Sequence, residues 1–199
     1  MTCSGALFTR PPETASFTDG DTASSGVAEF SSKKDSVIEI PWSAERSSVT
    51  GKSFSIQFFV RRSRTYFSET MFSQDGSTCG RDLTIGYTDL NEFSFGLGAA
   101  ADEKMLTPKN SYPSDHTMWV QWTVVFEKGS GSNTMKLFRN GGREALDKDG
   151  TVLHGTVAVD NCATGSYAVA GAPGGLDKFI GMMDELRVYT KALDDLSFT

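Results

Sequence analysis

Residues 119–127 read Trp-Val-Gln-Trp-Thr-Val-Val-Phe-Glu, and this stretch decides the fold. Val120, Trp122, Val124 and Phe126 recur at every second position. Because successive side chains of a β-strand point to opposite faces, this period of two predicts a strand with one core-facing side. Few stretches of the chain carry helical periodicity, which argues against a helical bundle and a doubly wound α/β fold.

The same alternation extends outward from this strand to most of the chain. It predicts further strands near residues 27–30, 36–41, 54–60, 70–73, 82–87, 92–97, 135–139, 151–159, 166–170 and 179–189. About a dozen short strands separated by turns indicate an all-β, two-sheet antiparallel jelly-roll sandwich. Residues 27–199 are expected to form this domain, and residues 1–26, rich in Thr, Ser, Pro, Asp and Gly, an irregular leader. Residues 99–117 are expected to be a long polar connection, and residues 190–196 a closing helical turn.

One face of the predicted strands supplies the expected interior of the sandwich. The predicted core residues are Phe30, Phe54, Ile56, Phe58, Phe95, Phe126, Leu137, Leu186 and Val188. Trp119 and Trp122 are assigned to packing in the core or at its edge.

Charge and composition exclude several classes of function. The 199 residues carry a formal net charge of −6, which argues against a nucleic-acid partner. No stretch approaches the roughly 18–20 apolar residues of a membrane span, so no membrane insertion is expected. The first 15 residues lack the apolar centre of a secretory signal, which predicts an intracellular chain or the excised part of a longer one.

The three cysteines are Cys3, Cys79 and Cys162, and no pair has the spacing of a zinc site. Cys79 and Cys162 lie in two similar turn-rich stretches that can meet at one rim of a sandwich. A bridge between them would close a loop of about 80 residues and stabilise the fold by roughly 4 kcal/mol. Three free thiols are the alternative.

The segment from Phe179 to Leu193 reads Phe-Ile-Gly-Met-Met-Asp-Glu-Leu-Arg-Val-Tyr-Thr-Lys-Ala-Leu. It resembles the F-x-G-x-I-D-E-V-R-I-Y-x-x-A-L motif of laminin-G-like jelly-roll domains, within the concanavalin A-like lectin/glucanase superfamily. Residues 30–41, 54–60, 119–125 and 137–141 resemble further motifs of the same family, in the same order. Gln121 and Phe59 stand where the family usually has His and Trp, and Ser31-Ser32 replaces its Asp-Gly turn.

The resemblance implies a binding or adhesive module, often one domain of a larger surface or secreted protein. It therefore favours an extracellular or cell-surface location and a glycan or protein partner. The same superfamily contains glycoside hydrolases, whose chemistry needs two carboxylates facing one cleft. Asp184 and Glu185 are adjacent in a predicted strand and so point apart. No enzymatic activity is predicted.

Ring stacking and hydrogen bonds to hydroxyls are what a sugar site needs. Tyr66 and Tyr112 are the candidate rings, since both lie in loops or at strand ends. Asn110 and Asp115, beside Tyr112 in the long connection, are the candidate polar partners. The basic run 61–64 (Arg-Arg-Ser-Arg) is expected to be a solvated loop, or alternatively to dock an acidic partner or a sulfated glycan.

Asp184 is the candidate centre of a calcium site. It is expected to share the core-side face with Leu186 and Val188, where a carboxylate needs hydrogen bonds or a cation. Backbone N–H groups of a neighbouring loop are the first interpretation. Ca²⁺ is the second, with Asp19 and Asp21 supplying further oxygens, because related jelly-roll domains often carry such a site in the early loop.

The sequence therefore predicts a non-catalytic binding module, carbohydrate-binding or adhesive, with calcium as a candidate cofactor. The alternative is a structural subunit that holds other proteins in a larger assembly.

Overall fold

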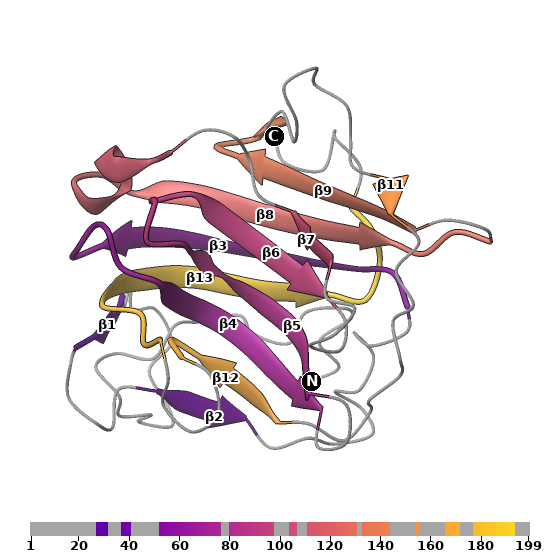
Figure 1. The fold of residues 1–199 in the computed structure, drawn as a ribbon, viewed down its shortest axis with the longest axis horizontal. Coiled ribbons are helices and arrows are strands. Elements are labelled where there is room, and N and C mark those ends of the chain that lie inside the picture. The colour runs from indigo at the N-terminus through magenta and orange to yellow at the C-terminus, as the bar shows by residue number, and fades with distance from the viewer. Residues whose placement is uncertain are drawn as a thin grey trace, which may run out of the picture.

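The structure is a computed structural model of the chain, viewed face-on in Figure 1. The residues it describes are 27–31, 37–40, 52–76, 80–97, 104–106, 111–130, 133–143, 154–155, 166–171 and 177–193. The predicted leader and five of the predicted site residues lie outside these ranges, namely Asp19, Asp21, Cys79, Asn110 and Cys162.

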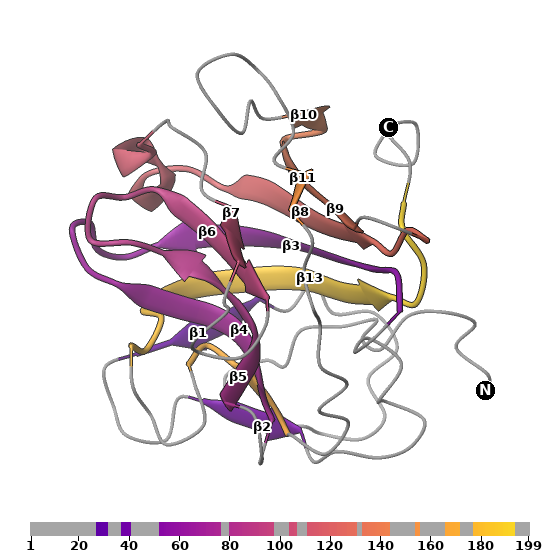
Figure 2. The same cartoon turned by 45° about the vertical axis from the view of Figure 1, so that its right-hand side comes forward.

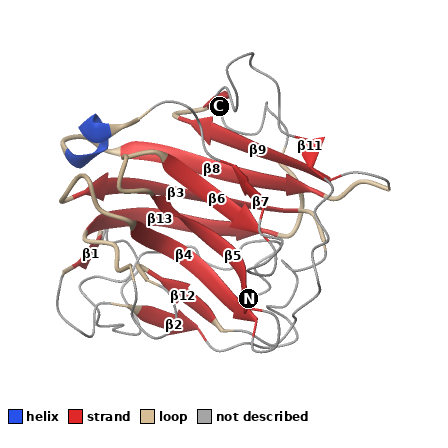
Figure 3. Cartoon of the chain, viewed as in Figure 1, coloured by secondary structure: helices blue, strands red, loops and turns tan. Residues whose placement is uncertain are grey.

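The described residues form two antiparallel sheets, as the prediction of an all-β sandwich requires. Figure 3 draws the 3-10 turn η2 (Pro113–His116) as a helix at the edge of the strands that the structure describes. The seven-stranded sheet contains, in spatial order, β1 (Ala28–Phe30), β13 (Gly181–Tyr189), β3 (Phe54–Arg62), β8 (Val120–Glu127), β9 (Asn133–Arg139) and β10 (Gly142–Arg143), with β11 (His154–Gly155) also paired to β9. The six-stranded sheet contains β2 (Ile38–Ile40), β12 (Tyr167–Val169), β4 (Glu69–Gly76), β5 (Gly80–Tyr87), β6 (Phe93–Leu97) and β7 (Lys104–Leu106).

The two sheets are stacked, with β4, β5 and β6 lying over β3, β8 and β13 (Figures 1 and 2). All nine predicted core residues are buried between them, as is Trp122. The rings of Phe93 and Trp122 stack across the interface at 3.8 Å between centroids. Aromatic side chains bury the largest areas in a core, so this packing explains how alternating strands of few residues form a stable sandwich.

Two expectations about the connections differ from what the described residues show. Residues 99–117 were expected to be a long polar connection, but within them β7 pairs with β6 and η2 follows at residues 113–116. The described part of the expected closing turn, residues 190–193, is not helical. Instead the Ser55 hydroxyl donates to the carbonyl of Lys191 at 3.0 Å and accepts from the N–H of Leu193 at 2.9 Å. Residues 191–193 therefore lie against the outer face of the seven-stranded sheet at Ser55.

Strand β13 contains a β-bulge that changes the expected orientation of Asp184. Before the bulge Asp184 is opposite Phe59, and after it Arg187 is opposite Gln57. Three residues on β13 therefore span two on β3, and Glu185 has a positive φ of 51°. Asp184 consequently lies on the outer face, not on the core-side face of Leu186 and Val188.

No helix among the described residues has the length and apolar character needed to cross a membrane.

Candidate functional site

The outer face of the seven-stranded sheet carries two partly exposed aromatic rings. Phe59 on β3 is 37 % exposed, and Trp119, directly before β8, is 38 % exposed. Phe59 is in register with Gln121 on one neighbouring strand and with Asp184 on the other. A ring is thus flanked by an amide and a carboxylate at the strand spacing of about 4.8 Å.

Arg61 and Asn140 extend this row of side chains. The guanidinium of Arg61 lies 6.0 Å from the ring centroid of Trp119. Asn140 donates its backbone N–H to the carbonyl of Gln121 at 2.9 Å, and its side-chain oxygen accepts the N–H of Gln121 at 3.0 Å. Phe59, Arg61, Trp119, Gln121 and Asp184 together form what we call the sheet platform.

The other end of the same outer face is covered. Ser55 is in register with Val125, and Thr123 with Phe138; all four point away from the sandwich core, yet each is at most 1 % exposed. Leu193, which binds the Ser55 hydroxyl, is 7 % exposed. The sheet platform lies at the end of this face where β3 finishes and β8 begins, whereas on β3 and β8 the outward residues at the other end are buried.

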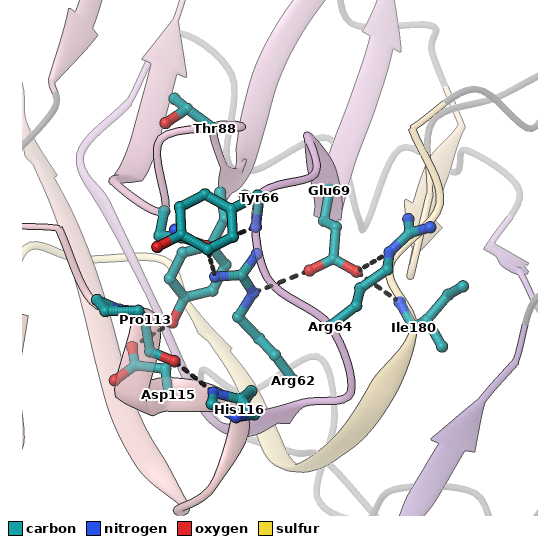
Figure 4. Close-up of polar contacts among 12 residues, drawn as sticks. Arg62, Arg64, Tyr66, Glu69, Thr88, Pro113, Asp115, His116 and Ile180 are labelled. Carbon is teal, nitrogen blue, oxygen red and sulfur yellow. Dashed lines mark hydrogen bonds and ion pairs between the residues drawn. The ribbon is translucent and has the colours of Figure 1, made fainter.

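On the inner side of that same end lies a buried ion-pair network. Glu69 accepts from Arg62 Nε at 2.9 Å, from Arg64 Nε at 2.7 Å and from the N–H of Ile180 at 3.2 Å (Figure 4). The side chains of Arg62 and Glu69 are both 0 % exposed. The expectation that the basic run 61–64 forms a solvated loop is wrong for Arg62, which ends β3 on its inner face and lies 4.1 Å from the ring centroid of Tyr87.

Asn91 connects this network to two neighbouring loops. Its side-chain oxygen accepts from Arg62 Nη1 at 3.1 Å and from the N–H of Tyr66 at 2.8 Å. Its carbonyl accepts the N–H of Tyr112 at 2.8 Å. Tyr66 is 68 % exposed and has a positive φ of 61°. A tyrosine rarely adopts this backbone conformation, and the hydrogen bond that its N–H donates to Asn91 stabilises the main chain at this position.

Tyr112 and Asp115 come together, but inside the protein. Tyr112 is 8 % exposed and packs edge-on against Trp122, while Asp115 is 0 % exposed. Asp115 accepts from Arg139 Nη2 at 2.6 Å and from the Tyr87 hydroxyl at 2.6 Å. The expectation of an exposed ring beside an available carboxylate is therefore wrong for this pair, because η2 folds both side chains inward.

The hydroxyl of Tyr87 stands between a carboxylate and an indole. It donates to Asp115 and accepts from Trp122 Nε1 at 2.8 Å. Burial, together with the neighbouring Asp115 carboxylate, raises the pKa of Tyr87 well above its ordinary value. Burial also raises the pKa of Tyr167 to about 12. Both hydroxyls are therefore held in their neutral form.

The expected calcium site has a single described member. Asp184 Oδ1 accepts the N–H of Glu185 at 2.7 Å, which satisfies one of its lone pairs within the bulge. Within the described part of the chain, no group of three or more His, Cys, Asp or Glu side chains gathers closely enough to hold a metal ion. With Asp19 and Asp21 outside that part, the calcium site stays a prediction.

Sequence reasoning missed the sheet platform, although a signal was available. In the predicted strand 54–60, Phe59 lies out of phase with the apolar residues. An aromatic residue on the polar face of a strand points to the surface, where it is accessible to a partner. Arg61 continues that outward series, and Arg62 continues the inward one.

The chain belongs to the concanavalin A-like lectin/glucanase superfamily, because the laminin-G-type family of that description matches residues 33–196. This match and the two antiparallel sheets confirm the family resemblance and the fold class predicted from the sequence. A search of curated protein sequences found no match.

Solved structures with the same fold include two carbohydrate-associated domains and a toxin domain. The CBM40 domain of the Ruminococcus gnavus IT-sialidase, bound to α2,3-sialyllactose, has a TM-score of 0.61 at 14 % identity and covers 81 % of this chain and 94 % of that one. Domain 4 of AbnA, an extracellular arabinanase of Geobacillus stearothermophilus, in complex with arabinotriose, has a TM-score of 0.59 at 18 % identity, covering 91 % and 82 %. The botulinum neurotoxin DC binding domain, in complex with rat synaptotagmin II, has a TM-score of 0.54 at 15 % identity, covering 84 % and 40 %. At these identities the likeness shows the fold.

Proposed function

We propose that this chain is a non-catalytic carbohydrate-binding module that holds glycans on the sheet platform. The observation that carries the proposal is the row of two partly exposed rings set among amide and charged groups on a paired sheet. Aromatic rings stack on the apolar faces of sugars, and amides and carboxylates bind the hydroxyls. The sugar complexes of the CBM40 and arabinanase domains support this choice of ligand class.

The spacing of the rings defines the size of the ligand. Trp119 is the diagonal neighbour of Phe59 across the β3–β8 pair, a relation that separates Cα atoms by roughly 7–8 Å. One sugar unit does not span two rings so placed, because each ring needs a face of its own. A glycan of at least two units, lying across the strands, fits this arrangement.

A glycan array followed by calorimetric titration tests the proposal. The full chain should bind at least one family of oligosaccharides. Trp119→Ala should then lower the affinity about tenfold or more, as expected when a central aromatic contact is removed. Leu90→Ala is the matched control, because Leu90 is 63 % exposed but lies on the β5–β6 turn of the six-stranded sheet, outside the platform.

Two results would contradict the proposal. One is an array without binding in either the presence or the absence of calcium. The other is glycan binding that Trp119→Ala and Phe59→Ala both leave at the wild-type level.

Calcium dependence is a separate part of the proposal, supported by the sequence and by the outward position of Asp184 beside Phe59. The carboxylate would supply one oxygen ligand on the face where the sugar lies. A chelator added to the titration should then lower the affinity for the glycan. Asp184→Asn should reduce the gain in affinity on addition of calcium. Equal affinity for the glycan with and without calcium would contradict calcium dependence but not glycan binding on the sheet platform. An extracellular or cell-surface location is likewise a proposal, based on the family.

A protein partner is the second candidate function, favoured by a different surface. Tyr66, Phe67, Leu90 and Met118 are each 48 % exposed or more, and they lie on three loops at one end of the sandwich. Tyr, Phe and Met are enriched at protein interfaces. Sedimentation over a range of concentrations and chemical crosslinking of the full chain test for assembly. A strictly monomeric chain that crosslinks to no partner protein would count against this function.

A further inference from the structure

The sheet platform consists of two rows of outward side chains on β13, β3 and β8, which lie side by side (Figure 1). The first row holds Phe59 between Asp184 and Gln121. It therefore offers an aromatic ring, a carboxylate and an amide to a single sugar unit. Sugar hydroxyls both donate and accept hydrogen bonds, so this row suits a neutral unit.

The second row has a cation at its centre. Arg61 is opposite Met182 on β13, and its guanidinium lies 6.0 Å from the ring centroid of Trp119, directly before β8. Neither of these two neighbours carries a charge. Among the residues that the structure describes, Arg61 takes part in no ion pair, and its guanidinium donates no hydrogen bond. The side chain is partly exposed, so its donors are accessible to a ligand.

The two charges of the platform occupy diagonal positions. Arg61 is opposite Met182, whereas Asp184, two residues further along β13, is opposite Phe59. Diagonal neighbours on adjacent strands are separated by roughly 7–8 Å. None of the ion pairs between described residues joins Arg61 to Asp184. A ligand that crosses both rows therefore meets a positive group at one end and a negative group at the other.

We propose that the second row of the sheet platform binds the acidic unit of a glycan. The acidic unit lies on the ring of Trp119, and its carboxylate accepts hydrogen bonds from the guanidinium of Arg61. The neighbouring unit lies on Phe59, where its hydroxyls donate to Asp184. The inference rests on the proposed function, in which two rings hold two sugar units. It adds the charge of the ligand and the direction in which the ligand lies on the sheet.

The chemistry of the guanidinium favours a carboxylate over a hydroxyl. Its planar donors match the two oxygens of a carboxylate, and such charge-assisted hydrogen bonds are about twice as strong as neutral ones. The chain as a whole has a net charge of −6, so an unpaired cation on an otherwise uncharged row attracts an anionic group to one place. Asp184 makes the opposite choice in the first row, because a carboxylate accepts from hydroxyls and repels a second anion.

Calorimetric titration of the full chain with matched disaccharides tests the proposal. The probes join galactose to glucuronic, galacturonic or N-acetylneuraminic acid, and each is compared with its carboxyl-reduced counterpart in the same buffer. At least one acid should bind about tenfold more tightly than its reduced counterpart, because only the acid forms charge-assisted hydrogen bonds. Its affinity should also fall as the salt concentration rises, whereas the affinity for the reduced sugar should stay nearly constant.

Variants at two arginines of the seven-stranded sheet assign the preference to Arg61. Arg61→Gln should remove the tenfold preference and leave the affinity for the reduced sugar at the wild-type level. Arg61→Lys should retain part of the preference, since an ammonium keeps the charge but not the paired donors. Arg187→Gln is the matched control and should leave the preference unchanged. Arg187 also lies on the outer face, with its side chain 44 % exposed, but it is already paired with Glu185.

The outcomes separate this inference from the proposed function. The inference is overturned if no acid binds more tightly than its reduced counterpart, or if Arg61→Gln leaves the preference unchanged. An equal loss of preference in Arg187→Gln also overturns it, because the cause would then be net charge alone. A neutral oligosaccharide whose affinity depends on Trp119 would in each of these cases still support the proposed function. Absence of binding by every glycan, acidic or neutral, would contradict both.

Discussion

Arg61 and Arg62 are consecutive residues of one strand, and they lie in opposite environments. Arg61 is on the outer face, 6.0 Å from the ring centroid of Trp119 and in contact with solvent. Arg62 is 1 % exposed, paired with Glu69, and lies over the ring of Tyr87. The alternation of the strand alone separates a surface cation from a buried one.

Two identical side chains at adjacent positions therefore have different roles, one structural and one at the surface. A buried charge must be paired and hydrogen-bonded, so the inner arginine organises the protein around it. Through Glu69 and Asn91 it ties together the β3–β4 loop, the β5–β6 turn and the start of β13. A partly exposed arginine such as Arg61 needs no buried partner and is available for a ligand.

Removal of the buried carboxylate is the strongest way to test the difference. Glu69→Ala leaves Arg62 buried without its partner, and the free energy of unfolding should fall by about 3–5 kcal/mol. Urea unfolding of the full chain measures this loss. Glu127→Ala is the control, because Glu127 is 51 % exposed and pairs with Lys136 at the surface, where about 0–1 kcal/mol is expected.

The double variant Arg62→Met, Glu69→Met sharpens the same test. Replacing both buried charges by apolar residues should recover part of the loss seen in Glu69→Ala. A double variant as unstable as the single one would show that packing, not the unpaired charge, causes the loss.

Stability at alkaline pH depends on the two buried tyrosines, Tyr87 and Tyr167. The pKa of Tyr87 is raised and that of Tyr167 is raised to about 12, whereas an unfolded tyrosine ionises near pH 10. Above about pH 10 the unfolded chain holds fewer protons than the folded one, so the free energy of unfolding should decrease as pH rises toward 12. Urea unfolding across this range measures the slope, and Tyr167→Phe should flatten it. A slope identical in Tyr167→Phe would contradict the assignment.

Tyr66 tests whether the network stores backbone strain at the surface. Asn tolerates positive φ better than Tyr, so Tyr66→Asn should raise the free energy of unfolding by about 0.5–1 kcal/mol. Thermal or urea unfolding measures the change. Tyr66→Phe is the control, which keeps the strain and should leave stability nearly unchanged. A loss of stability in Tyr66→Asn would mean that the packing of the Tyr66 ring stabilises the fold by more than its backbone strain destabilises it.

Arg61 provides the smallest expected effect. Arg61→Ala removes one exposed cation–π contact, and the free energy of unfolding should change by about 0.5–1 kcal/mol or less. A loss comparable to that of Glu69→Ala would abolish the distinction between the two arginines.

The sequence predicted the sandwich well because the period of two is local information. Val120, Trp122, Val124 and Phe126 could be assigned to the core from their own spacing, and all four are buried. The role of Arg62 could not be predicted in this way. Its partner Glu69 lies across a loop, and Asn91 comes from the other sheet, so only the tertiary structure brings them together.

The site residues show the same limit. Tyr112 and Asp115 were read as exposed because they lie in a polar connection, yet η2 turns them into the core beside Trp122 and Arg139. Asp184 was assigned to the wrong face because one extra residue in β13 shifts the alternation, and no residue type marks that position in advance.

That extra residue also sets a rule for engineering the strand. Positions 182 and 184 look outward before the bulge, whereas 187 and 189 look outward after it. A library that randomised every second position from 182 onward would reach Leu186 and Val188 and dismantle the interior. A library that varies positions 182, 184, 187 and 189 changes the outward surface of the strand and leaves the packed interior intact.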